Sequence, residues 1–90
     1  MNSPTDTATN SFQQLLDFLR RLETHKLHFF LEHNRGEAIM VLITVPGERW
    51  EVEFFADGGI EVEVFGGSGG VLSGTEAQAA LDRLFIVHGD

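Results

Sequence analysis

Hydrophobic and acidic residues alternate along residues 50–55 and again along residues 60–65. Alternation with a period of two is typical of β-strands that bury one face and expose the other. The four residues between the two runs, Ala56, Asp57, Gly58 and Gly59, are mostly of the kinds that form tight turns. The pattern therefore predicts a β-hairpin, and the rest of the chain can be interpreted as support for it.

The register of this hairpin follows from the separation of its faces. A three-residue loop closed by Gly58 in the left-handed conformation pairs Phe55 with Gly59. The apolar pairs then share one side: Phe54 with Ile60, Val52 with Val62, and Trp50 with Val64. The acidic pairs share the other: Glu53 with Glu61, and Glu51 with Glu63. A shorter or longer loop would mix the faces.

Two further strands precede the hairpin. Residues 26–34 alternate, and residues 38–45 are apolar on both faces, which is typical of a central strand. A type II′ turn with Gly47 and Glu48 at its centre would join the second of these strands to the hairpin. It pairs Val45 with Trp50, Ile43 with Val52, and Val41 with Phe54. Met40, Leu42 and Thr44 then lie on the acidic side.

Helical spacing appears on both flanks of the strands. Residues 12–24 carry a leucine and phenylalanine stripe after a predicted capping box of Ser11 and Gln14. Residues 76–86 carry a second apolar stripe after a predicted capping box of Thr75 and Gln78. Both helices need an apolar partner, and the apolar side of the sheet supplies one.

The predicted fold is a two-layer α+β sandwich made of an N-terminal helix, a four-stranded antiparallel meander and a C-terminal helix. Residues 1–10 are expected to be a disordered or frayed tail, and residues 11–90 a single domain. The glycine-rich residues 66–70 are expected to be a flexible connector. The pattern leaves open whether Val71 and Leu72 add a short edge strand.

Charge narrows the classes of partner. The 90 residues include 14 acidic and 6 basic ones, a net charge of −8. Nucleic acids and anionic membranes both demand a basic surface, so neither is expected as a partner. A basic protein is favoured instead. The absence of cysteine excludes disulfides and thiolate metal sites and fits a cytoplasmic protein, and the pattern leads us to expect neither a signal peptide nor a membrane-spanning run.

The acidic side of the sheet is the best candidate for function. It should gather Glu51, Glu53, Glu61 and Glu63, bordered by Met40, Leu42, Phe55 and Phe65. Such a surface suits a basic protein partner, because charge steers the encounter and apolar contact supplies affinity. Two alternatives stay open: a homodimer that buries the same face, and a site for a small molecule or a metal ion. A polar sheet face that serves only solubility would explain the glutamates as well.

Other candidate chemistries lack essential parts. His25, His28 and His33 resemble a ligand set, but a strand places His28 and His33 on opposite faces. The glycine-rich residues 66–70 lack the lysine of a phosphate-binding loop. Ser68 and Ser73 lack a nucleophile elbow and a partner base. We therefore expect no catalytic residue, no cofactor and no enzymatic activity, and we assign no metal-ligating residue.

The sequence also carries a resemblance. Residues 46–55, followed by Asp57-Gly58 and by residues 60–63, look like a pattern in short uncharacterised bacterial proteins. In size, acidity and α–β–α layout the chain is similar to immunity proteins that neutralise secreted bacterial toxins. That similarity implies a non-enzymatic, immunity-like or antitoxin-like role. It assigns no individual contact residue.

Overall fold

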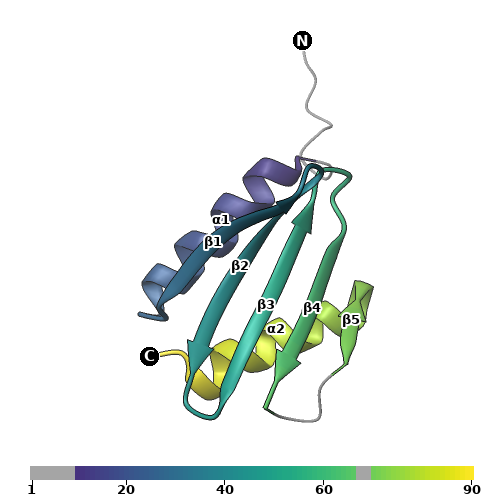
Figure 1. Ribbon diagram of the computed structural model, residues 1–90. Helices are drawn as coiled ribbons and strands as arrows, with labels where there is room; N and C mark the ends of the chain where they lie inside the picture. The colour runs from purple at the N-terminus through teal and green to yellow at the C-terminus, as the bar shows by residue number, and fades with distance from the viewer. Residues whose placement is uncertain (1–9, 67–69) are drawn as a thin grey trace.

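A computed structural model describes residues 10–66 and 70–90, which form two helices and an antiparallel sheet (Figure 1). The elements, in chain order, are α1 (Ser11–Thr24), β1 (Phe29–Arg35), β2 (Ala38–Val45), β3 (Glu48–Phe55), β4 (Ile60–Phe65), β5 (Val71–Ser73) and α2 (Gly74–His88). The strands lie side by side in the order β1-β2-β3-β4-β5. The predicted α+β fold is confirmed, with one strand more than the predicted four. Residues 1–9 of the expected tail and residues 67–69 of the expected connector lie outside the described residues.

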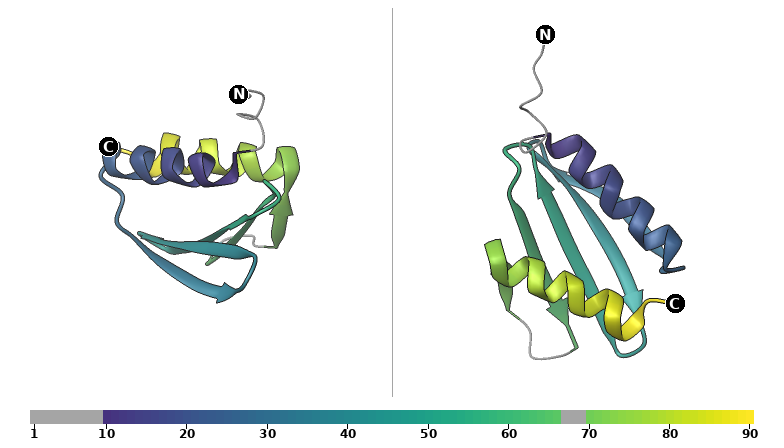
Figure 2. Two further views of the ribbon diagram at one scale, coloured as in Figure 1. Left: turned by 90° about the horizontal axis from the view of Figure 1, so that it is seen from above. Right: turned by 180° about the vertical axis from the view of Figure 1, so that it is seen from behind.

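Both helices cover the same side of the sheet, as the view from above makes plain (Figure 2). The core lies between these two layers and includes Leu15, Phe18 and Leu22 of α1 and Ala77, Ala80, Leu81, Leu84 and Phe85 of α2. The sheet contributes Val41, Ile43, Trp50, Val52, Phe54, Val62 and Val64. The Trp50 indole N–H donates to Glu48 Oε1 at 3.0 Å, so burial of this ring leaves no unpaired donor. The predicted apolar side is confirmed.

The predicted register of the β3–β4 hairpin is also confirmed. Phe54 pairs with Ile60, Val52 with Val62, Trp50 with Val64, Glu53 with Glu61, and Glu51 with Glu63. Gly58 has a φ of +94°, and the Phe55 N–H donates to the Gly59 carbonyl at 2.9 Å. Asp57 tightens the loop by accepting the Gly59 N–H at 2.9 Å. The turn chemistry and the face separation therefore agree.

The predicted register between β2 and β3 is wrong by two residues. The observed pairs are Ile39 with Phe54, Val41 with Val52, Ile43 with Trp50, and Val45 with Glu48. The two central turn residues are Pro46 and Gly47, with Gly47 at a φ of +81°. The predicted turn would have placed Pro46 in a flanking pair that exchanges two N–H bonds, and proline has no N–H to donate. A shift of two residues preserves the faces, so the core assignment survives.

A short fifth strand, β5, pairs antiparallel with β4 and places Leu72 beside Val62. This settles the question left open for Val71 and Leu72. Three residues are too few to carry a recognisable alternation, so the hydrophobic pattern alone could not predict this strand.

Both predicted capping boxes are wrong. The cap of α1 is Asn10, whose Oδ1 accepts the Gln13 N–H at 2.9 Å. Asparagine is as good an N-cap as serine, and this choice frees the Ser11 hydroxyl to donate to the Ala56 carbonyl. The second helix begins at Gly74, so Thr75 already lies within it, and its N-cap makes no side-chain hydrogen bond.

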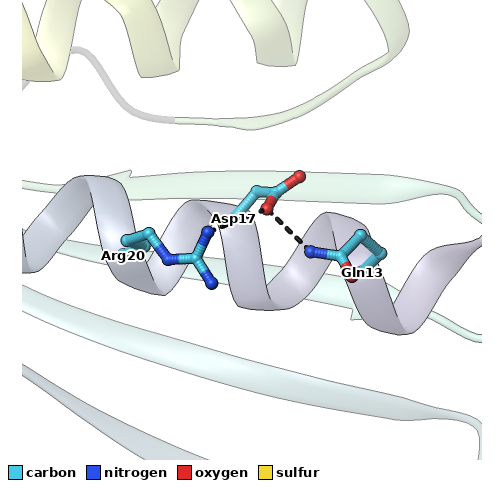
Figure 3. A network of polar contacts seen from close by, with 3 residues as sticks. All are labelled: Gln13, Asp17 and Arg20. Carbon is cyan, nitrogen blue, oxygen red and sulfur yellow. Dashed lines mark hydrogen bonds and ion pairs between the residues drawn. The ribbon is translucent and has the colours of Figure 1, made fainter.

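The solvent side of α1 carries a small polar network (Figure 3). The Gln13 Nε2 donates to Asp17 Oδ1 at 2.9 Å, and an Arg20 nitrogen lies 4.0 Å from the same oxygen. Pairs at these spacings each stabilise a helix by roughly 0.2–0.5 kcal/mol. Because this network is exposed on the helix layer, it belongs to the stability of α1 and is remote from the uncovered side of the sheet.

Gly66 provides a direct test of how closely β4 approaches the β2–β3 turn. Its φ is +102°, and a Cβ placed there would collide with the Gly47 carbonyl oxygen. We expect Gly66→Ala to lower the free energy of unfolding by about 1–3 kcal/mol in urea denaturation. Gly58→Ala is the matched control, because Gly58 also has a positive φ, +94°, but a Cβ added there would have no other atom within 4 Å. Equal effects of the two substitutions would contradict the close approach.

Candidate functional site

The side of the sheet opposite the helices, here called the open face, is the side seen from the front in Figure 1. All eight residues predicted for a binding surface lie on it: Met40 and Leu42 of β2, Glu51, Glu53 and Phe55 of β3, and Glu61, Glu63 and Phe65 of β4. The two cross-strand glutamate pairs stand directly opposite each other. Like charges so placed cost roughly a few tenths to 1 kcal/mol for each pair.

Two arginines, Arg35 and Arg49, also belong to the open face. The Arg35 Nη2 lies 3.3 Å from Glu53 Oε1, and its guanidinium carbon lies 5.3 Å from the centre of the Phe55 ring. Arg35 reaches this side through an irregularity in the β1–β2 pairing between Glu32 and Arg35. A local register shift of this kind leaves no signal in a hydrophobic pattern.

Arg49 repeats the arrangement on β3, which is separated from β1 by β2. Its Nη2 lies 3.4 Å from Glu51 Oε2, and its guanidinium carbon lies 4.4 Å from the centre of the Phe65 ring. Arg49 lies two residues before Glu51 on β3, so its side chain points to the same face. Continuing the predicted alternation by one more residue pair would have placed Arg49 on the open face. Two guanidinium groups are thus set against the four predicted carboxylates and against Glu32, which pairs with Met40 and so lies on the same face.

The four glutamates differ sharply in their surroundings. Glu53 has only 4% of its surface exposed, whereas Glu51, Glu61 and Glu63 are half-buried. Glu53 lies on the middle strand of five, with Met40 of β2 on one side and Glu61 of β4 on the other. Its position between two long side chains explains the burial.

The buried Glu53 carboxylate is only partly satisfied. Its Oε1 meets Arg35, but its Oε2 has no hydrogen-bond partner among the residues that the structure describes. A buried polar group without a partner costs about 1–3 kcal/mol, and more when it is charged. A glutamate so placed needs an explanation that goes beyond a soluble sheet surface.

A hollow of about 200 Å³ opens beside Glu53. Its charged lining consists of Arg35, Glu51, Glu53, Glu61 and Glu63, and its apolar lining consists of Met40, Val62 and Val71. Glu53 is the buried open-face side chain of this lining, and it lies at the bottom of the hollow; the side chain of Val62 faces the core on the other side of the sheet. Glu61 and Glu63 make no ion pair within residues 10–66 and 70–90. The hollow thus presents unneutralised carboxylates around a buried one.

A second hollow, of about 610 Å³, lies between the β3–β4 loop and the start of α2. Its acidic members, Asp57 and Glu61, are both at least partly exposed. Because it has no buried polar group that lacks a partner, it offers less specific chemistry than the hollow beside Glu53.

The histidines lie outside the open-face carboxylate cluster. His25 follows α1 and packs on Phe85, with ring centres 5.0 Å apart. His28 packs edge-on against Phe30 at 4.9 Å. Among the described residues, no three His, Asp or Glu side chains are grouped as a bound metal ion would require. Neither α1 nor α2, the two helices of the described chain, combines the length and the apolar character needed to cross a bilayer.

The burial of Glu53 gives a quantitative prediction for its pair with Arg35. We expect Arg35→Met to destabilise the protein, because it leaves Glu53 buried without its counter-charge, and to have little effect once Glu53→Gln is present. A double-mutant cycle in urea should give a coupling energy of about 1–3 kcal/mol.

The Arg49–Glu51 pair is the internal control for this cycle. Its glutamate side chain is 23% exposed, against 6% for Glu53, while the two arginines are almost equally exposed. The cycle with Arg49→Met and Glu51→Gln should therefore give at most about 1 kcal/mol. A coupling for Arg35 and Glu53 no larger than this control would contradict the account of the buried carboxylate.

Comparisons with protein-family models, with curated proteins and with solved structures found no match for this chain. The similarity to immunity proteins therefore stays a prediction. Any function has to be argued from the geometry of the open face.

Proposed function

We propose that this chain is a non-enzymatic binding protein that docks a basic protein partner on its open face, in the manner of an immunity protein or an antitoxin. The observation that carries the proposal is the gathering of Glu51, Glu53, Glu61 and Glu63 on one side of the sheet, where two arginines oppose them among the described residues. The net charge of −8 adds a long-range attraction for the same class of partner.

The open face combines the two properties that such an interface needs. Glu61 and Glu63 are half-buried and without ion pairs within the described chain, so they can steer a basic surface toward the sheet. Met40, Leu42 and the phenylalanines beside the arginines supply apolar contact area. Charge then governs encounter and register, while apolar burial governs the lifetime of the complex.

A second copy of the chain is a less favourable occupant. A two-fold symmetric dimer places the same patch of each subunit against the other. The glutamates of the two copies would then be brought together, and within the described residues Arg35 and Arg49 of each copy would offset part of their charge. Charge complementarity therefore favours a foreign, basic partner.

Charge reversal at the rim of the open face tests the proposal. Glu61→Lys combined with Glu63→Lys should weaken binding of a basic partner, isolated from the native host, by at least about tenfold in calorimetry. The wild-type affinity should also fall as salt is raised, because the attraction is screened. Glu53 is unsuitable for reversal, since a lysine there would be buried beside Arg35.

Glu23→Lys combined with Glu76→Lys is the matched control, because it changes the net charge equally at exposed positions on the helices. The control should bind as the wild type does. Equal binding by the open-face variant would contradict the proposal. Sedimentation at low micromolar concentration should show a monomer. A stable dimer that dissociates in the open-face variant, but not in the control, would assign the surface to a second copy of the chain.

A further inference from the structure

We propose that the hollow beside Glu53 is a subsite for a single arginine side chain, whose guanidinium group enters it and donates to Glu53 Oε2. The proposal deepens the binding role of the open face and rests on it for the source of the arginine. It makes a separate claim, that one specific pocket recognises one chemical group.

The buried carboxylate oxygen is the observation that points to a ligand. Glu53 is 4% exposed, Arg35 serves only its Oε1, and Oε2 has no partner among the described residues. An incoming donor would complete the hydrogen bonding of a group that the folded chain leaves incomplete. Charge-assisted bonds of this kind are the stronger class of hydrogen bond.

The surroundings of Glu53 select a cation. Arg49 neutralises Glu51, but Glu61 and Glu63 line the same hollow with no ion pair in the described part of the chain. An anion or a neutral acceptor would meet three further carboxylates there. A metal ion is disfavoured because the described residues do not group three suitable ligands around one point.

A guanidinium fits this hollow better than an ammonium. Entry beside Glu53 requires loss of hydration, and a guanidinium is more weakly hydrated than the ammonium of lysine. Its planar fork can also reach Glu53 and a rim carboxylate together. The hollow of about 200 Å³ has room for this group, and Met40 and Val71 can contact the apolar stem of the arginine.

Entry requires one adjustment of the rim. Glu53 Oε2 is covered in the structure, so a neighbouring side chain has to turn aside to admit a ligand. Met40, Glu61 and Glu63 are only half-buried, and the two glutamates have no ion pair within the described residues to hold them. Rotation of such side chains is fast and inexpensive compared with a backbone change.

A titration with small probes tests the subsite without a protein partner. N-acetyl-argininamide should produce saturable shifts in the backbone amide NMR signals of Met40, Glu53, Glu61, Glu63 and Val71. The citrulline analogue, which is nearly the same shape but uncharged, should produce none that saturate. Equal shifts from the two probes would overturn the proposal. Equal affinity for N-acetyl-lysinamide would overturn the assignment to a guanidinium.

Two variants connect the binding to Glu53. Glu53→Gln keeps the shape of the side chain, and it should weaken the affinity for the arginine probe by at least about tenfold. Glu32→Gln, at an exposed glutamate of β1 that pairs with Met40, is the control and should bind as the wild type does. Unchanged binding by Glu53→Gln would overturn the proposal. If that variant does not fold, the comparison of arginine with citrulline on the wild type decides alone.

The subsite and the proposed function can fail separately. A basic partner that is lost on charge reversal of Glu61 and Glu63, but unaffected by Glu53→Gln, would remove the subsite and leave the docking surface. Saturable binding of the arginine probe, in a chain that binds no basic protein through its open face, would retain the subsite and remove the proposed function.

Discussion

The register of the β3–β4 hairpin is the constraint on which the rest of the molecule depends. A loop closed by Gly58 at positive φ sets Trp50, Val52 and Phe54 against apolar partners on β4. The same pairing forces the glutamates of the two strands onto the other side. A slip of one residue would exchange the faces and expose the core, so the hydrophobic layer and the acidic layer are two consequences of one loop.

The sequence was sufficient for features that combine a period with turn chemistry, and insufficient for those that depend on one residue's backbone. The β3–β4 register follows from alternation and from Gly58 together. The predicted β2–β3 register was wrong because the prediction placed Gly47 at the first central position of the turn. That turn puts Pro46 in the flanking pair, and proline cannot supply the N–H that this pair needs. The error left every face unchanged, because a two-residue shift conserves parity.

In the candidate site, too, some features could be predicted from the sequence and others could not. The positions of Glu51, Glu53, Glu61 and Glu63 on the open face were predictable, because side chains alternate between the two faces of a strand. The same alternation predicts the position of Arg49. Arg35 was not, because it reaches the open face through an irregularity between β1 and β2. The burial of Glu53 also escaped prediction, since it depends on how the side chains of three adjacent strands cover one position. That burial distinguishes Glu53 from the half-buried glutamates beside it, because it leaves Oε2 without a hydrogen-bond partner among the described residues.

The central claim is that the open face is an accessible surface that attracts cations, and paramagnetic relaxation measures this directly. A cationic and a neutral nitroxide of similar size would be compared through the relaxation of each backbone amide. The account predicts that the cationic probe adds relaxation to the β3 and β4 amides nearest Glu61 and Glu63, and adds much less over the core-facing residues of α1 and α2. Equal relaxation by the two probes along β3 and β4 would contradict it.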